Sequence, residues 1–390
     1  MCTLQLPKKI IEHIDRARRH CLWRKSNENS NRPQSLAAWN LVCKPKDKGG
    51  LGIIDLHYQN TSLLMKHLYK FYNEQDLPCV KLWNKYYHNV DLPPHACKEI
   101  GSFWWKNIFR LIPLFRAVIK IRVKGGDTVL FWKDNWLPHG QTLADSHSSL
   151  FSFSNSKDIS CFSFISNPSV QNHFNLPLSS QAMTEWRSLE NIIQHTSLSS
   201  SNDSWDYPWD GLFSHSKKIY SLFFAHLQPA VPLTHIWKSK CTLKLKVFLW
   251  LLLMSWLNTL AMLQHKNLLS TPNISCGMCN SNQAEDLTHL FFACPFAAQC
   301  WSYLGIQWHG NLEFMNMILV AKQNFGLSFF YEVIAVASWN IWLRRNDLIF
   351  NNIRPSLSRW KCLFKEDFTL LLHRVNRQDI PAWQSWIDQL

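Results

Sequence analysis

Residues 276–294, CGMCNSNQAEDLTHLFFAC, decide how this part of the chain folds. The spacing is C-x2-C-x9-H-x4-C: a tight turn carries Cys276 and Cys279, and a short apolar run separates His289 from Cys294. We expect this run to form a helical turn that begins at His289 and ends at Cys294. Three thiolates and one imidazole form the tetrahedral donor set that structural zinc prefers. The sequence therefore predicts one zinc ion per chain, bound by these four side chains.

The donor set also predicts the role of the metal. All four positions are Cys or His, which leaves no open coordination position, so the zinc is structural and not catalytic. We expect it to clamp its loop onto the helix around Trp250. Cys300 and, farther away, His265 are rival ligands. The spacing matches neither the C-x2-C-x4-H-x4-C knuckle nor the C₂H₂ finger, so the zinc site alone does not predict nucleic-acid binding.

The composition indicates a folded, mainly helical protein. In 390 residues, 46% are hydrophobic and 17% charged, which excludes wholesale disorder. Residues 8–25, 53–90, 103–116 and 331–346 have apolar positions at helical spacing, and a break is expected near Pro113. Gly125, Gly126 and Asp127 lie between β-prone runs and predict a hairpin over residues 122–132. We predict an α+β fold, mainly α with small β-hairpins and a zinc-stapled helical C-terminal domain.

The net charge of +14 points to an anionic partner. The excess of Lys and Arg lies mostly in residues 1–150, and such a basic region favours nucleic acid first and a membrane surface second. We expect RNA or DNA phosphates to contact two groups of residues. The first group lies in the helix predicted at residues 8–25 and the second in the hairpin region: Lys8, Lys9, Arg16, Arg18, Arg19 and Arg24, then Lys120, Arg122 and Lys124.

Cysteine usage and hydropathy bear on the compartment. The twelve cysteines are mostly scattered, and no secretory signal peptide is recognisable, so we expect a reducing, nuclear or cytoplasmic location and not secretion. The one apolar run long enough to consider as a membrane span is 247–263. It is marginally short and contains polar residues, so a buried helix explains it equally well. We therefore expect no membrane association.

Motifs for catalysis are absent from the sequence. The glycine cluster in residues 44–52, KPKDKGGLG, lacks the order of a phosphate-binding loop and reads as a tight turn. The adjacent acidic pairs, 285–286 and 366–367, do not lie in the strand–turn–strand context that two-metal polymerase chemistry needs. No G-x-S-x-G and no H-E-x-x-H is present. We predict no catalytic residues and no enzymatic activity.

Several motifs resemble one family. The runs WKSK at 237–240, LKVFLWLLL at 245–253, the four zinc ligands, and WNIWLRRN at 339–346 are similar to the zinc-binding domain that follows reverse transcriptase in plant LINE-type (non-LTR) retrotransposons. Residues 39–66 and the run GGD…FWKDNW at 125–136 resemble the region just after the polymerase in these elements. The aromatic-x-Asp-Asp turn of the polymerase is missing. Residues 242–243 and 256–258 also depart from the usual family residues, but leave the zinc ligands intact.

The resemblance implies a domain organisation. Residues 1–138 correspond to the basic post-polymerase region and 205–304 to the reverse transcriptase zinc-binding domain, and a helical C-terminal tail follows at 305–390. Residues 139–204 carry little of the resemblance, and their composition, rich in Ser, Asn and His, predicts a variable linker or a weakly structured connector. The resemblance also implies a C-terminal fragment of a retroelement polyprotein, whose missing polymerase portion is a further partner.

Three functions are compatible with these features. The leading hypothesis is a non-catalytic zinc-binding module associated with nucleic acid. The alternative is a structural or protein-interaction remnant without nucleic-acid binding, which docks a partner through exposed tryptophans and the 247–263 helix. Reverse transcriptase activity is the third, and the missing Asp-Asp turn argues against it.

Overall fold

The computed structural model describes residues 4–23, 35–74, 76–87, 102–137, 140–209, 215–229, 231–269, 273–279 and 281–390. The chain divides into two compact units. Unit 1 comprises Met1–Ile14 and Leu56–Ala225, and unit 2 comprises Asp15–Asp55 and His226–Leu390. Helix α1 (Lys8–Trp23) contributes its first residues to unit 1 and the rest to unit 2. The predicted mainly helical fold is confirmed, because the described residues contain a single two-stranded sheet.

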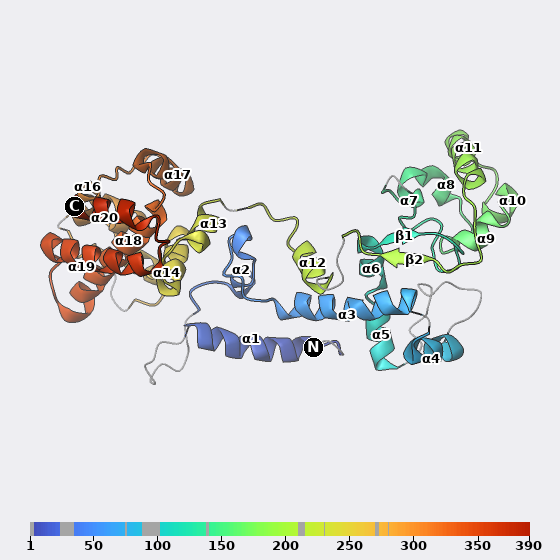
Figure 1. The fold of residues 1–390 in the computed structure, drawn as a ribbon, viewed down its shortest axis with the longest axis horizontal. Coiled ribbons are helices and arrows are strands. Elements are labelled where there is room, and N and C mark those ends of the chain that lie inside the picture. The colour runs from blue at the N-terminus through green and yellow to red at the C-terminus, as the bar shows by residue number, and fades with distance from the viewer. Residues whose placement is uncertain are drawn as a thin grey trace. The chain divides into compact units, whose positions relative to one another are not determined.

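Unit 1 is built around α3, which contacts α5, α6, α12 and β2 (Figure 1). Aromatic side chains fill its core, with Trp132, Trp205, Phe115 and Phe131 fully buried. Its elements are α3 (Leu56–Asn73), α4 (Pro78–Tyr87), α5 (Phe103–Phe109), α6 (Ile112–Val118), β1 (Lys120–Arg122), α7 (Leu143–Ser146), α8 (Ser148–Ser152), α9 (Cys161–Ile165), α10 (Val170–His173), α11 (Ser180–Gln194), β2 (Ser204–Asp206) and α12 (His215–Leu222). The break expected near Pro113 is confirmed, because this proline lies in the first turn of α6.

The strand pairing differs from the hairpin expected over residues 122–132. Strand β1 pairs antiparallel with β2, a segment far along the chain, with Ile121 opposite Trp205. The Gly125–Gly126 loop wraps around the buried carboxylate of Asp203 instead of joining two paired strands. Asp203 accepts hydrogen bonds from the backbone N–H groups of residues 124, 126 and 128 and from the Thr128 hydroxyl, at 2.7–3.2 Å. A distant carboxylate thus satisfies the backbone donors that a local hairpin would have paired.

The segment expected to be a weakly structured linker, 139–204, is folded where the structure describes it. Residues 140–204 form α7 to α11 and pack into the core of unit 1. Helix α11 begins at an N-cap, where the Ser179 hydroxyl accepts from the Ala182 N–H at 3.1 Å. Its buried residues Trp186, Leu189 and Ile193 recur at helical spacing. The Ser and Asn residues that suggested a linker therefore belong in part to helix caps and to an exposed helix face.

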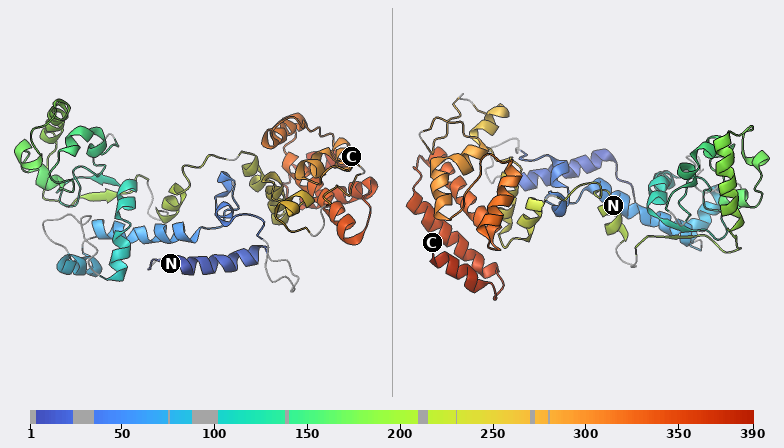
Figure 2. Two further views of the ribbon diagram at one scale, coloured as in Figure 1. Left: turned by 180° about the vertical axis from the view of Figure 1, so that it is seen from behind. Right: turned by 90° about the horizontal axis from the view of Figure 1, so that it is seen from above.

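Unit 2 is a helical assembly around α18, which contacts α14, α16 and α19 (Figures 1 and 2). Its first two elements, α2 (Trp39–Val42) and the 3₁₀ turn η1 (Lys46–Lys48), come from the N-terminal part of the chain. The others are α13 (Val231–Lys238), α14 (Leu243–Leu253), α15 (Leu260–His265), the π-helical turn η3 (His289–Ala293), α16 (Pro295–Tyr303), α17 (Phe314–Phe325), α18 (Phe330–Asn351), α19 (Leu357–Leu370), η4 (Leu371–Arg374) and α20 (Ile380–Asp388).

Residues 305–390, expected to form a separate helical tail, share one hydrophobic core with residues 226–304. In α20, Trp383 stacks on Phe368 of α19 with ring centroids 5.1 Å apart. Phe329, just before α18, contacts Trp383 and Trp386. The last helices therefore complete the core that contains the Cys/His segment.

The glycine cluster after η1 forms the tight turn that its sequence predicts. Gly49 has a φ of 83°, and a Cβ at Gly50 would lie 2.0 Å from the Lys44 carbonyl oxygen. Both positions therefore require glycine. The turn docks on α14, since the indole N–H of Trp250 donates to the Gly49 carbonyl at 2.8 Å.

The apolar run 247–263 is a buried, interrupted helix. Its first part lies in α14, where residues 248–253 are buried, and Ser255 then takes a φ of 58° before α15 begins. Among the described residues, no single helix is both long and apolar enough to cross a membrane. The pair α17 and α18 passes that test only jointly, and a 119° bend separates the two helices.

Candidate metal centre

Cys276 and Cys279 lie on a small hairpin of unit 2. The ends of the hairpin are joined by an antiparallel bridge between Ser275 and Ala284. The Cys276 N–H donates to the Gln283 carbonyl at 2.8 Å, and the Glu285 N–H donates to the Ile274 carbonyl at 2.7 Å. These bonds join the two arms of the hairpin and fix the start of the C-x2-C turn at Cys276.

His289 and Cys294 lie at the two ends of one helical turn, as the spacing predicts. His289 begins η3, and Cys294 follows its last residue and is the N-cap of α16. The backbone of the turn closes through a hydrogen bond from the Cys294 N–H to the His289 carbonyl at 2.6 Å. Pro295 starts α16, where its missing N–H leaves no donor unpaired.

The fold brings all four predicted ligands together. One ligand atom from each of Cys276, Cys279, His289 and Cys294 lies within 4.8 Å of the others. A tetrahedral zinc with bonds of about 2.0–2.3 Å separates its donors by roughly 3.3–3.8 Å, so small side-chain adjustments suffice. The Cys279 sulfur and the His289 Nε2 are already 3.3 Å apart. The residues therefore fit one zinc ion, and within the described residues this is the one cluster of its kind.

The surroundings of Cys294 favour its thiolate. The Cys276 thiol hydrogen-bonds to the Cys294 sulfur, and the N–H groups of Phe296 and Ala297 at the start of α16 also point to it. These bonds lower the pKa of Cys294 to about 5, while the same thiol–thiolate contact and burial raise the pKa of Cys276. A ligand that is already ionised at neutral pH binds zinc without having to release a proton first.

Glu285 ties the hairpin to two helices. This carboxylate is 1% exposed and forms an ion pair with Arg345 of α18 at 2.7 Å. It also accepts the N–H of Leu260, in the first turn of α15, at 3.0 Å. Neither residue is among the predicted site residues, although both fall within the segments that resemble the family. A charged pair at this distance in sequence gives no spacing signal of its own, so only the fold identifies it.

Contacts with α15 and α18 hold the hairpin, and α14, the helix expected, packs on the turn between His289 and Cys294, with the Phe248 and Phe291 ring centroids 6.2 Å apart. Glu285 anchors the hairpin to α15 and α18, and a Cβ at Gly277 would lie 3.2 Å from Leu348 of α18. Trp250, around which the clamp was predicted, binds the Gly49 turn instead. The rival ligands Cys300 and His265 do not belong to the cluster. Cys300 is fully buried, and burial raises the pKa of its thiol.

The basic residues predicted on α1 have divided roles. Lys8, Lys9 and Arg16 are exposed, and Lys8 is 3.9 Å from Glu12. Arg18 instead pairs with Asp15 at 2.6 Å and donates to the Ile54 carbonyl. Arg19 donates to the Asp15 carbonyl. The guanidinium groups of Arg18 and Arg19 both lie over the Trp39 ring. Arg24 lies outside the described residues.

The second predicted group lies on and beside one strand. In β1, Lys120 and Arg122 are exposed on either side of the buried Ile121, and Lys124 is exposed just beyond it. Alternation along a strand places the exposed pair on the same face. Arg122 forms an ion pair with Asp206 of β2 at 2.7 Å, so part of its charge is neutralised.

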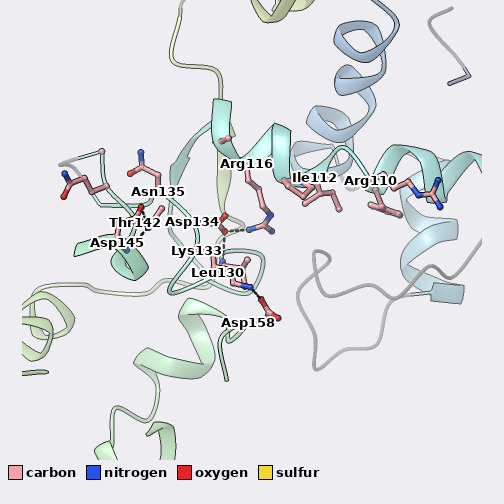
Figure 3. Close-up of a pocket in the computed structure, with 15 residues that line it drawn as sticks. Arg110, Ile112, Arg116, Leu130, Lys133, Asp134, Asn135, Thr142, Asp145 and Asp158 are labelled. Atoms are coloured by element: carbon pink, nitrogen blue, oxygen red, sulfur yellow. Dashed lines mark hydrogen bonds and ion pairs between the residues drawn. The ribbon is translucent and has the colours of Figure 1, made fainter. Parts of the chain in front are cut away.

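A cavity of about 620 Å³ lies in unit 1, between α5–α6 and the loops after β1. Figure 3 shows Arg116 reaching from α6 to the buried Asp134, with Lys133 paired to Asp158 at its edge. Thr142 and Asp145 also bind each other at 2.7 Å. The charged groups that line this cavity are thus largely occupied by their neighbours, which favours a structural role over a catalytic one.

Comparisons with known proteins agree with the geometry of the metal centre. A family model described as "zinc-binding in reverse transcriptase" matches residues 214–301. A relative from Arabidopsis thaliana, named "Putative ribonuclease H protein", is 24% identical over 77% of this chain, and the match spans about half, 48%, of that relative's length. An uncharacterized mitochondrial protein of the same plant is 26% identical over 35% of this chain and 89% of its own length. Residues 214–301 therefore match the zinc-binding domain found in reverse transcriptases, and the matched segment contains all four clustered ligands.

Proposed function

We propose that this protein is a non-catalytic, zinc-stapled module that associates with RNA or DNA. The observation that carries the proposal is the closed Cys₃His cluster, with three of its four ligands buried and Cys279 half-buried, inside the segment that matches a reverse transcriptase domain. Four protein ligands complete a tetrahedral zinc, so the metal supplies folding energy and no substrate position. The module would then serve as a rigid platform for nucleic acid.

The charge distribution supports the nucleic-acid partner. The net charge is +14, and Lys8, Lys9, Arg16, Lys120 and Lys124 expose their side chains. Phosphate contacts of this kind are sequence-independent and weaken steeply with salt, because each one releases condensed counterions. In this proposal Arg18, Arg19 and Arg122 contribute less, because each already has protein partners.

The name of one relative raises ribonuclease activity as a second candidate. Two-metal nuclease and polymerase chemistry uses clustered carboxylates. Within the described residues, the only grouping of three or more potential ligands is the Cys/His cluster, which favours a non-catalytic role. The test incubates the full chain with Mg²⁺ and an RNA–DNA hybrid, and separately with a primed template. Cleavage or primer extension above a Cys276→Ser control preparation would overturn the non-catalytic proposal.

The alternative of a protein-docking remnant has less support. It needed exposed tryptophans and an accessible 247–263 helix. Among the tryptophans whose burial the structure describes, none is exposed, and residues 248–253 are buried. Gel filtration together with nucleic-acid binding separates the two functions: oligomers without affinity for RNA or DNA at low salt favour docking, and salt-sensitive binding favours our proposal.

Two further parts of the proposal concern origin and location. Residues 1–138 would derive from the region after a retroelement polymerase and residues 205–304 from its zinc-binding domain. Every described cysteine is free, which suits a reducing nuclear or cytoplasmic compartment. Fractionation of cells that express the chain, with detection by an antibody, would test the location.

A further inference from the structure

A cluster of basic side chains surrounds the turn between α13 and α14 in unit 2. We call it the α14 basic patch. It combines three segments of the chain that are far apart in sequence: Lys46 of η1, Lys238, Lys240, Lys244 and Lys246 at the turn, and Arg374 of η4. None of these residues belongs to the two groups that the sequence points to.

Direct contacts hold these segments together. Lys46 Nζ lies 5.1 Å from the centre of the Trp237 ring, and Lys246 Nζ donates to the Trp237 carbonyl at 2.9 Å. From the other side, Arg374 Nε donates to the Lys240 carbonyl at 2.9 Å. The three chain segments therefore converge on a single turn, and their positive charges lie close together.

The buried Glu332 offsets the charge of the patch only in part, through Lys240 and Lys246. Within the described residues, none of its six side chains forms an ion pair, in contrast to Arg18 and Arg122. The nearest buried acid, Glu332, accepts the Lys240 backbone N–H at 2.6 Å, and burial raises the pKa of its carboxyl. Burial, together with the nearby Arg374 and Lys46, lowers the pKa of Lys246, and the neighbouring Cys241 and Glu332 oppose this shift.

The start of α14 adds to the positive potential. The helix has eleven residues, its first turn contains no acidic side chain, and the Thr242 hydroxyl caps it. The N-terminus of a helix carries a partial positive charge that attracts phosphate. Two half-buried indoles flank the patch, with Lys244 Nζ 4.4 Å from the centre of the Trp339 ring and Lys46 over Trp237. Cations interleaved with aromatic faces are typical of surfaces that bind single-stranded nucleic acid.

We propose that the α14 basic patch is the main phosphate-contact surface of this protein, and that its ligand is a single strand of RNA or DNA. The inference rests on the proposed nucleic-acid association and gives it a location. The exposed residues of α1 and β1 then act as secondary contacts. The patch belongs to the same unit as the zinc hairpin, and both depend on the core around α14 and α18.

The test measures fluorescence anisotropy of labelled oligo(U) and oligo(dT) with the full chain, at several salt concentrations. One variant combines Lys46→Gln, Lys238→Gln, Lys244→Gln and Arg374→Gln. The matched control removes the same charge from the sequence-predicted groups, with Lys9→Gln, Arg16→Gln, Lys120→Gln and Lys124→Gln. A third chain replaces Lys46, Lys238 and Lys244 by Arg, which keeps the charge. Zinc content and melting temperature verify that each variant is folded.

We expect the patch variant to bind at least about tenfold more weakly and to lower the salt slope by roughly 2–3, since each lost single-strand phosphate contact removes about 0.7. The control should change affinity by only about two- to threefold, and the Arg chain should bind like the unmodified protein. Equal losses in the patch and control variants would overturn the location while the proposed function stands. The location and the proposed function would both be overturned if the folded, zinc-loaded chain bound no strand at low salt. The same holds if it bound anionic lipid vesicles and no strand.

Discussion

The two units of this protein fix their irregular loops with different chemistry. In unit 1, the Asp203 carboxylate gathers three backbone N–H groups and a hydroxyl from residues 124–128. In unit 2, three thiols and an imidazole are gathered where a zinc ion fits, and Glu285 fastens their hairpin to α15 and α18. The first device depends only on the chain, whereas the second makes the stability of unit 2 depend on metal.

The comparison extends to the buried ion pairs. Among the described residues, each unit has one pair in which both side chains are almost fully buried: Arg116–Asp134 in unit 1 and Glu285–Arg345 in unit 2. Both pairs are almost fully buried, so their members compensate each other's loss of hydration. The difference is their position, since Glu285 directly follows the bridged end of the metal hairpin. The two pairs should therefore respond alike in stability but differently in metal binding.

The largest effect should come from removing a ligand. Cys276→Ser should abolish the one bound zinc and destabilise unit 2 by roughly 5 kcal/mol or more, because structural zinc contributes about 10–16 kcal/mol in small domains. Zinc content by mass spectrometry and hydrogen exchange of peptides from each unit measure this. The exposed Cys362→Ser is the matched control. An equal loss of protection from hydrogen exchange in unit 1 would contradict the conclusion that only unit 2 depends on the metal.

Breaking the ion pairs should have the next largest effect. Arg345→Met and Arg116→Met each leave a buried carboxylate without its partner, which costs about 3–5 kcal/mol in the unit concerned. Only Arg345→Met should also weaken zinc binding, measured by competition with a chelator. The exposed Arg359→Met should change neither property. A drop in zinc affinity for Arg116→Met would contradict our expectation that only the ion pair of unit 2 affects metal binding.

A smaller effect is expected where the Asp203 carboxylate binds the loop of residues 124–128. Asp203→Asn keeps the shape of the side chain but replaces charge-assisted bonds by weaker ones and puts an amide donor against backbone donors. We expect a loss of roughly 2–3 kcal/mol in unit 1. Chemical denaturation with and without a chelator measures it, and the loss should be the same in both. The exposed Asp158→Asn serves as a reference for an exposed ion pair.

The smallest effect should be a pH dependence in unit 1. Burial lowers the pKa of His147 below its ordinary 6.5, so the unfolded chain binds a proton more readily than the folded one. The resulting stability is present above pH 6.5 and is lost as the pH falls through the lower folded value. His147→Gln should flatten this slope in denaturation curves of chelator-treated protein, whereas the exposed His195→Gln should leave it unchanged. If the dependence of stability on pH persisted in His147→Gln, its assignment to His147 would be refuted.

Local patterns were sufficient for much of the fold. The helical spacing predicted α1, α3 and α18, and Pro113 marked the break between α5 and α6. The same reasoning was wrong for residues 140–204, because short helices with polar exposed faces have the composition of a linker. It was also wrong for the hairpin at 122–132, since nothing near Gly125 reveals that Asp203 will occupy the loop.

The zinc ligands were determined by the sequence itself. Four donors within nineteen residues need only one turn and one short helical segment to meet, so spacing and chemistry are sufficient. The Glu285–Arg345 pair and the α14 basic patch were decided only by the tertiary structure. Their members lie in segments far apart in the chain, and burial and contact between such segments depend on the packing of the whole core around α18. Charge counts record how many cations the chain has, whereas the fold decides which of them are paired and which face solvent together.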